Sequence, residues 1–319
     1  MSDLVVTVLR KKQEAQDIAS FELARADGGP LPAFSAGSHI DVHVPGGPVR
    51  QYSLCNDAGE QHRYRIAVLR DPATRGGSAG MHDGVREGDR LTISEPRNHF
   101  PLVHARRSVL LAGGIGVTPL LCMAQRLAAI GADFTLHYCT RSAARTAFRD
   151  EILASTFAGR VQFHFDDGEP AQKLDLAAAL GGHPAADTHL YVCGPTGFID
   201  FAVQGARAAG FGSDQIHLEY FGAAPQDTRG DGTFEVKIAS SGQVVAVPAG
   251  QTVVQALAAA GVEILTSCEQ GVCGTCLTRV LEGECDHRDL YLTDEEKARN
   301  DQFTPCCSRA KSPVLVLDL

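Results

Sequence analysis

The sequence predicts a multidomain protein in which an N-terminal antiparallel β-barrel, a central α/β domain with a parallel sheet and a C-terminal α+β domain follow one another. Three observations support this prediction. A chain of 319 residues is too long for one ordinary domain. The spacing of apolar residues changes near Ser108, and residues 223–232 have no hydrophobic period. We therefore expect domains at residues 1–103, 104–222 and 233–319, with a linker at 223–232.

The composition excludes several classes of protein. With 44% hydrophobic and 21% charged residues, the chain can bury a globular core. Its 29 basic and 38 acidic residues give a net charge of -9, which argues against nucleic-acid binding. The first residues lack the apolar segment of a signal peptide, and no apolar run approaches the roughly 20 residues that span a bilayer. We expect a cytoplasmic protein without membrane contact, whose 10 cysteines stay reduced.

Short strands separated by turns fill the N-terminal domain. Several of them alternate apolar and polar residues, and glycine and proline cluster between them. About five or six short strands at this spacing favour a small antiparallel barrel or sandwich. The predicted strands are Leu4–Leu9, Ile18–Leu23, His39–Val44, Tyr64–Leu69 and Arg90–Ser94.

The central domain alternates strands with helices. The apolar run Ser108–Ala112 leads into a glycine turn, and helical spacing follows Pro119, a residue tolerated in a first helical turn. This order predicts βαβ units and a parallel sheet. The other predicted strands are Phe134–Cys139, Val161–Phe165 and His189–Cys193.

The C-terminal domain begins with a hairpin, Phe234–Ile238 and Val244–Val247, and a helix near Thr252–Ala260. A cysteine loop follows, with the spacing C-x4-C-x2-C and a distant fourth cysteine; these are Cys268, Cys273, Cys276 and Cys306. This spacing is that of plant-type [2Fe–2S] ligands. The alternatives are structural zinc, which usually pairs two short ligand arms, and unligated core cysteines.

The fourth ligand has a rival in the neighbouring cysteine. In an extended chain, the side chains of Cys306 and Cys307 point in opposite directions. The spacing rule does not decide between them.

Two turns of the central domain point to a bound dinucleotide. The turn Gly113–Gly116 joins a strand to a helix, an arrangement that directs backbone N–H groups at a diphosphate, although tight strand–helix packing explains it equally well. The segment Cys193–Pro195 ends another strand, at the sheet edge where ligands gather. Asp166 also follows a strand; it is either a ribose ligand that favours NADH over NADPH or a solvated carboxylate.

The strand segment Arg50–Ser53 combines a cation, an aromatic ring and a hydroxyl. Arginine suits a phosphate, and tyrosine and serine suit a flavin ring. Without further context, such a segment is more often ordinary surface.

Four ordered motifs together resemble one family: Arg50-x-Tyr52-Ser53, Gly113-Gly114-x-Gly116-x-Thr118-Pro119, Cys193-Gly194-Pro195 and the cysteine loop. The chain resembles, over essentially its whole length, the phthalate dioxygenase reductase and vanillate demethylase reductase family of the ferredoxin–NADP reductase-like superfamily. The resemblance implies a flavin barrel, an NADH domain and a C-terminal plant-type ferredoxin domain with a β-grasp fold. Members with this domain order use FMN.

The resemblance also implies roles for individual residues. FMN would be held at its phosphate and ring by Arg50, Gln51, Tyr52, Ser53, Val68, Leu69, Arg75, Gly77 and Ser78. NADH would be bound by Gly113, Gly114, Gly116, Thr118, Pro119, Asp166, Cys193, Gly194 and Pro195. Phe221 would cover the flavin at the nicotinamide site, and the ending Cys306-Cys307-Ser308-Arg309-Ala310 would place the fourth cluster ligand on Cys306.

The implied function is an NADH-dependent oxidoreductase that passes electrons through FMN and the cluster to a Rieske-type non-haem iron oxygenase, met in a transient complex. Ser53, Phe221 and Cys193 would lie at the reacting centre, Cys193 without acting as a nucleophile. Two alternatives remain: the same reductase serving a haem or di-iron monooxygenase, and a non-catalytic metal-binding protein.

Overall fold

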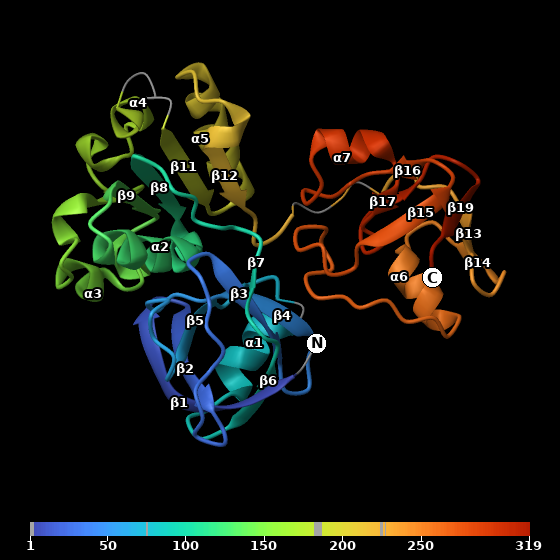
Figure 1. Cartoon of the computed structure of the whole chain (residues 1–319), viewed down its shortest axis with the longest axis horizontal. Coiled ribbons are helices and arrows are strands. Elements are labelled where there is room, and N and C mark those ends of the chain that lie inside the picture. Colours follow the sequence, from blue (N-terminus) through green and yellow to red (C-terminus); the bar gives the residue numbers. More distant parts are fainter. Residues whose placement is uncertain (1–2, 75, 182–186, 224–225, 227) are drawn as a thin grey trace. The chain divides into compact units, whose positions relative to one another are not determined.

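The computed structural model describes residues 3–74, 76–181, 187–223, 226 and 228–319. The chain divides into two compact units, Met1–Phe221 and Gly222–Leu319 (Figure 1). The first unit contains two lobes.

The N-terminal lobe is an antiparallel sheet with the strand order β4-β3-β6-β1-β2-β5, to which β7 adds by pairing with β3. Among the described residues, β4 and β5 share no hydrogen-bonded ladder, so the sheet does not close into the predicted barrel. A short helix, α1, and a π-helical turn, Gly80–Gly84, follow β5. The strands are β1 (Leu4–Ala15), β2 (Ile18–Arg25), β3 (Ser38–His43), β4 (Val49–Ser53), β5 (Tyr64–Leu69), β6 (Arg90–Ile93) and β7 (Arg97–Asn98), and α1 is Gly77–Ala79.

The α/β lobe is a five-stranded parallel sheet with the order β10-β9-β8-β11-β12. Because all its strands run in one direction, their carboxyl ends meet at one edge. The elements are β8 (Arg107–Gly113), α2 (Val117–Ala129), β9 (Asp133–Thr140), α3 (Arg149–Leu153), β10 (Val161–Phe165), α4 (Leu176–Leu180), β11 (Thr188–Cys193), α5 (Thr196–Ala208) and β12 (Ile216–Glu219).

The two lobes share an apolar core. Ile18, Cys55 and Ala67 from the N-terminal lobe are buried in the same cluster as Leu120 of α2 and Tyr138 of β9. A second cluster, on the other face of the parallel sheet, packs α4 and α5 against β8 and β11. The shared core makes the two lobes one compact unit, because separating them would expose its apolar surface.

The second unit is an α+β domain. Its main sheet has the order β14-β13-β19-β15-β17, in which β13 runs parallel to β19 and antiparallel to β14. Thr252 caps α6 by accepting a hydrogen bond from the N–H of Gln255. The elements are β13 (Phe234–Ile238), β14 (Val244–Val247), α6 (Val253–Ala259), β15 (Thr278–Glu282), β16 (Cys285–Asp286), α7 (Asp294–Arg299), β17 (Gln302–Phe303), β18 (Arg309–Ala310) and β19 (Val314–Leu317).

The predicted fold class is confirmed, apart from the closure of the barrel. The predicted domain limits at 103 and 222 and the linker at 223–232 stay predictions. No helix in the described part of the chain is long and apolar enough to cross a membrane.

Candidate functional site

The two turns predicted to bind a dinucleotide lie side by side at the carboxyl edge of the parallel sheet. Cys193 pairs with Ala112 in the ladder between β11 and β8. A Cβ atom on Gly116 would lie 2.2 Å from the carbonyl oxygen of Cys193, and one on Gly194 would lie 2.9 Å from the Cα of Gly113. Only glycine permits this approach of the two backbones.

The turn also leaves space in front of α2. Gly114 has φ 56°, and no atom lies within 4 Å of the position that its Cβ would take. The hydroxyl of Thr118 donates a hydrogen bond to the carbonyl of Ile115 over 3.1 Å, and Pro119 is buried in the first turn of α2. A glycine turn that opens in front of a helix fits a diphosphate group.

Asp166 lies at the same edge of the sheet, directly after β10. Its N–H donates to the carbonyl of Thr140, the last residue of β9, over 3.0 Å. The carboxylates of Asp166 and its neighbour Asp167 are exposed. Both are therefore available to a ligand that crosses the strand ends.

A hydrogen bond joins the two lobes at this edge. The hydroxyl of Ser53, at the end of β4, lies 3.4 Å from Oε2 of Glu219, at the end of β12, and donates to it. Glu219 pairs with Cys193 in the ladder between β12 and β11. Burial raises the pKa of Glu219 to about 8, although the Ser53 hydrogen bond lowers it.

Two further predicted residues lie near Glu219: Cys193 is its neighbour across the ladder, and Phe221 follows it along the chain. Cys193 is fully buried, and burial, followed by the charge of Glu219, raises the pKa of its thiol well above the usual value. This agrees with the expectation that Cys193 is no nucleophile. Phe221, two residues after Glu219, is 41% exposed, so its ring is accessible to a ligand.

Glu219 is a candidate that the sequence analysis missed. It belongs to the segment Leu218–Phe221, from which only Phe221 was selected. Nothing in the local spacing links Glu219 to Ser53, because a distant strand of another lobe supplies the serine. The available signal was a carboxylate at the end of a strand in an α/β sheet.

The residues predicted to hold a flavin phosphate lie around β4 and α1. The side chain of Arg50 lies so close to Gly77 that a Cβ atom there would lie 2.7 Å from its Cγ. Ser78 donates from its hydroxyl to Oγ1 of Thr74 over 3.1 Å. A guanidinium group beside a helix start suits a phosphate. Arg75 lies outside the described residues.

The predicted ring-binding residues divide between two strands. Tyr52 is half-buried, and burial raises the pKa of its hydroxyl to about 12; Gln51 beside it is also half-buried. On β5 the side chain of Val68 is buried in the core of the N-terminal lobe, whereas Leu69 packs against the shared core. The structure thus does not gather all of these side chains on one surface.

The cysteine loop folds tightly around its thiols. A Cβ atom on Gly274 would lie 2.3 Å from the ring of Tyr291, so glycine is needed there, at φ 70°. The N–H of Gln270 donates to Sγ of Cys268 over 3.3 Å, and the thiol of Cys273 donates to Oγ1 of Thr275 over 3.3 Å. Polar groups directed at sulfur suit a cluster whose potential such hydrogen bonds tune.

The side chains of the four predicted ligands lie close enough to interact in pairs. The pairs are Cys268 with both Cys273 and Cys306, and Cys276 with Cys306. Within the described ranges, no three His, Cys, Asp or Glu side chains are arranged to hold a metal ion. The spacing C-x4-C-x2-C with a distant fourth cysteine is that of plant-type [2Fe–2S] ligands, whereas structural zinc usually pairs two short ligand arms.

The neighbouring thiol has other surroundings. Cys307 interacts with Thr304 and Ser308 as well as with Cys306, and its Sγ lies 2.3 Å from where a Cβ on Gly271 would be. The geometry therefore favours Cys306 as the fourth ligand. Cys285 is buried in the apolar core of this unit.

Comparisons with known proteins agree with these features. Residues 236–311 match the family described as the 2Fe-2S iron-sulfur cluster binding domain. The chain is 57% identical to vanillate O-demethylase oxidoreductase of Pseudomonas sp. (strain HR199 / DSM 7063), with 100% of both chains covered.

Two solved structures are also similar. One is phthalate dioxygenase reductase, described as a modular structure for electron transfer from pyridine nucleotides to [2Fe–2S]; its TM-score is 0.79 at 42% identity, with 100% of this chain and 98% of that chain covered. The other is an intact type IV self-sufficient cytochrome P450 monooxygenase, with a TM-score of 0.85 at 38% identity. The match covers 99% of this chain but only 41% of that longer protein. By its relatives, the chain belongs to the family of oxygenase reductase components that includes vanillate O-demethylase oxidoreductase and phthalate dioxygenase reductase.

Proposed function

We propose that the protein takes electrons from NADH and passes them through FMN and a [2Fe–2S] cluster to a terminal oxygenase of the Rieske non-haem iron type. The observation that carries this proposal is the hydrogen bond from Ser53 to Glu219, which joins the end of β4 to the edge of the parallel sheet beside Cys193. The predicted flavin motif and the predicted nucleotide turns therefore meet at one place.

The chemistry requires a cofactor that accepts two electrons together and releases them one at a time. NADH gives up two electrons as a hydride, whereas a [2Fe–2S] cluster accepts one at a time; bound FMN supplies the conversion. The chain itself binds and orients the FMN and the dinucleotide. Arg50 and Gly77 suit the FMN phosphate, Gly113–Gly116 suit the dinucleotide diphosphate, and Ser53 with Glu219 holds a proton beside the reacting centre at neutral pH.

The cluster domain provides the exit for the electrons. We assign its ligands as Cys268, Cys273, Cys276 and Cys306. The first three have the plant-type spacing, and Cys307, unlike Cys306, also interacts with Thr304 and Ser308. The complex with the oxygenase is transient in this proposal, because one reductase must deliver electrons repeatedly. We further propose a cytoplasmic location, where thiols stay reduced.

A second candidate acceptor has specific support. The similarity to a self-sufficient cytochrome P450 monooxygenase favours the same reductase serving a haem oxygenase. In both cases the chain delivers electrons and another protein activates oxygen. Reconstitution with each class of oxygenase, scored by product formed per NADH consumed, distinguishes the two acceptors.

The test of the proposal is an anaerobic titration with NADH and, separately, with NADPH, followed by visible absorption. The flavin is first extracted and identified. We expect FMN, bleaching of both flavin and cluster bands by NADH, and much weaker bleaching by NADPH. A colourless protein, or one whose spectrum NADH does not change, would contradict the proposal and favour a non-catalytic metal-binding protein.

A further inference from the structure

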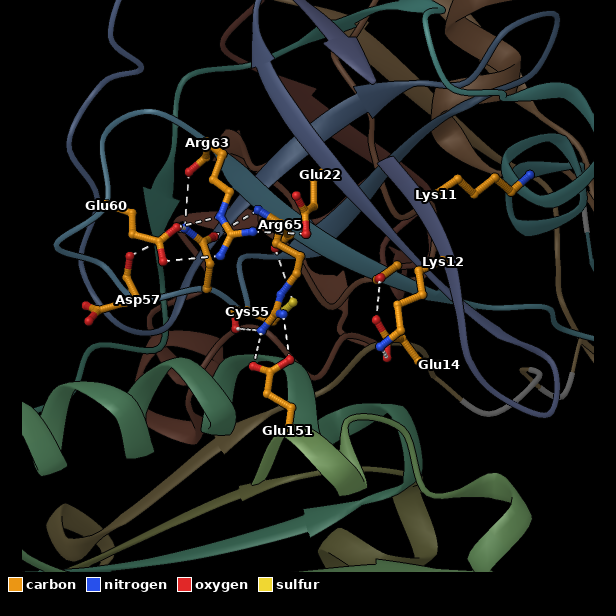
Figure 2. A network of polar contacts seen from close by, with 12 residues as sticks. Lys11, Lys12, Glu14, Glu22, Cys55, Asp57, Glu60, Arg63, Arg65 and Glu151 are labelled. Atoms are coloured by element: carbon orange, nitrogen blue, oxygen red, sulfur yellow. Dashed lines mark hydrogen bonds and ion pairs between the residues drawn. The ribbon is translucent and has the colours of Figure 1, made fainter. Parts of the chain in front are cut away.

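Arg65 is a buried cation at the seam between the two lobes of the first unit. It lies on β5 of the N-terminal lobe and points at α3 of the α/β lobe (Figure 2). Its Nη1 and Nη2 atoms donate to the two carboxylate oxygens of Glu151, each over 2.7 Å. Such a two-pronged ion pair fixes the orientation of its partners as well as their distance.

Two more contacts hold the guanidinium of Arg65. Nη2 also donates to the carbonyl of Cys55 over 3.2 Å, and the guanidinium carbon lies 4.9 Å from the ring centre of Phe148. Phe148 is buried and has φ 59°, a left-handed conformation that a side chain of this size rarely adopts. Residues persist in such a conformation only where their surroundings impose it.

Two contacts flank this centre on the same seam. The N–H of Gln16 donates to the carbonyl of Ala144 over 2.9 Å, and the guanidinium of Arg145 lies 3.3 Å from the carboxylate of Asp17. The α/β-lobe partners in these contacts of Gln16, Asp17 and Arg65 belong to residues 144–151, which we call the docking segment. This segment follows β9, and the end of β9 holds the N–H of Asp166.

We propose that Arg65 is a positioning residue, which sets where the dinucleotide edge of the parallel sheet stands relative to the flavin pocket by fixing the docking segment on β5. This inference rests on the proposed function. The strand that carries Arg65 also carries the predicted flavin residues Val68 and Leu69, so a shift of the docking segment moves the end of β9 against that strand. Hydride transfer is sensitive to such shifts, because a misplacement of about 1 Å costs up to about 100-fold in rate.

The alternative is that the ion pair serves stability alone, and paired substitutions separate the two roles. Arg65 is the buried partner and Glu151 is partly exposed. Removing Glu151 alone would leave the buried guanidinium without its counter-charge, whereas replacing both partners with apolar residues is often neutral for stability. We therefore choose the double variant Arg65→Met/Glu151→Met. The single variant Arg65→Lys keeps the positive charge but cannot form the two parallel hydrogen bonds to the carboxylate. Arg63→Met is the matched control, because Arg63 pairs with Glu60 and Glu22 inside its own lobe.

The experiment uses the full chain with its cofactors and has two readouts. The first is the anaerobic stopped-flow rate of flavin bleaching by saturating NADH, compared with bleaching by dithionite, which needs no dinucleotide. The second is hydrogen exchange of the Gln16 amide, which reports the seam, against the Val8 amide, whose bond to Asp89 lies within the N-terminal lobe.

We expect the double variant to slow bleaching by NADH about 10- to 100-fold and to leave bleaching by dithionite unchanged. The Gln16 amide exchanges at least about tenfold faster, and the Val8 amide does not change. Arg65→Lys gives intermediate values, and Arg63→Met gives wild-type values in both readouts.

Two results would overturn the inference. One is a double variant whose Gln16 amide exchanges faster but whose flavin is bleached by NADH at the wild-type rate. The other is a wild-type exchange rate of the Gln16 amide in both Arg65 variants. If the double variant fails to fold, Arg65→Lys alone decides by the same criteria. A wild-type protein that NADH does not reduce refutes the proposed function instead, and the exchange readout still tests the seam.

Discussion

The hydroxyl of Ser53 donates to the carboxylate of Glu219 over 3.4 Å, between residues that are 166 positions apart in the chain. The serine ends a strand of the antiparallel sheet and the glutamate ends the last strand of the parallel sheet. This bond brings a hydroxyl, a carboxyl group and the buried thiol of Cys193 to one edge.

Glu219→Gln should change how stability depends on pH. In the folded protein, burial raises the pKa of Glu219 to about 8, whereas an unfolded glutamate titrates near about 4.3. Between these values the folded state holds the proton and the unfolded state does not, so this group lowers stability progressively as the pH rises from about 4.5 to about 8. The variant has no such group, and its stability should fall less over that range.

The measurement is urea unfolding of wild type and Glu219→Gln at several values from pH 4.5 to 9. We expect the unfolding free energy of the variant to rise relative to that of the wild type as the pH rises. If the unfolding free energies of the two proteins change in parallel with pH, or if that of the wild type rises relative to the variant, the carboxyl group is ionised in the folded protein at neutral pH.

Gly116→Ala should damage the dinucleotide site and stability together. The new Cβ atom would lie 2.2 Å from the carbonyl oxygen of Cys193, so one of the two turns must move. We expect a loss of about 1–3 kcal/mol in unfolding free energy, typical of overpacking, and a higher KM for NADH. Gly197→Ala is the control, since nothing lies within 4 Å of its Cβ position. If the two variants have the same unfolding free energy and the same KM for NADH, the close contact of Gly116 with Cys193 is refuted.

Asp166→Asn should weaken the preference for NADH. Its exposed carboxylate stands at the ends of β9 and β10 and would repel the 2′-phosphate of NADPH. We expect the ratio of kcat/KM for NADH over NADPH to fall about tenfold, the size of a charge interaction near water. The control is Asp167→Asn; a larger change from that variant would transfer the role to the neighbouring carboxylate.

Cys306→Ser should abolish the visible spectrum of the cluster, and Cys307→Ser should preserve it. Cys306 interacts with Cys268 and Cys276, whereas Cys307 interacts with Cys306, Thr304 and Ser308. Cys285→Ser controls for the loss of any buried thiol in this unit. Absorption spectra and iron analysis of the three proteins decide, and loss of the cluster from the Cys307 variant alone would reverse the assignment.

The sequence predicted the elements whose signals are local. The parallel strands are apolar runs in the sequence, and the glycine-rich turns between strand and helix are visible from their composition. The hairpin Phe234–Val247 has a turn between two strands that alternate apolar and polar residues. Strand β12 was missed, because Ile216–Glu219 is short and its residues are only half-buried. Strand β19 (Val314–Leu317) was also missed, although it is apolar and Pro313 directly precedes it.

The parts that could not be predicted depend on contacts between distant segments. Ser53 and Glu219 meet only because β4 and β12 end near each other, and Arg65 meets Glu151 only because the lobes pack together. Neither pair has a spacing that a single sequence reveals. The cysteine loop is the opposite case, since three of its four predicted ligands lie within one short segment.

The relay of electrons along one chain is tested most directly by rapid-freeze electron paramagnetic resonance of the purified protein after anaerobic mixing with NADH. The account predicts about two irons and two sulfides per chain, one FMN, and the signal of a reduced [2Fe–2S] cluster that grows after NADH is added. A protein that contains zinc in place of iron and sulfide, or whose cluster stays oxidised while NADH is consumed, would contradict it.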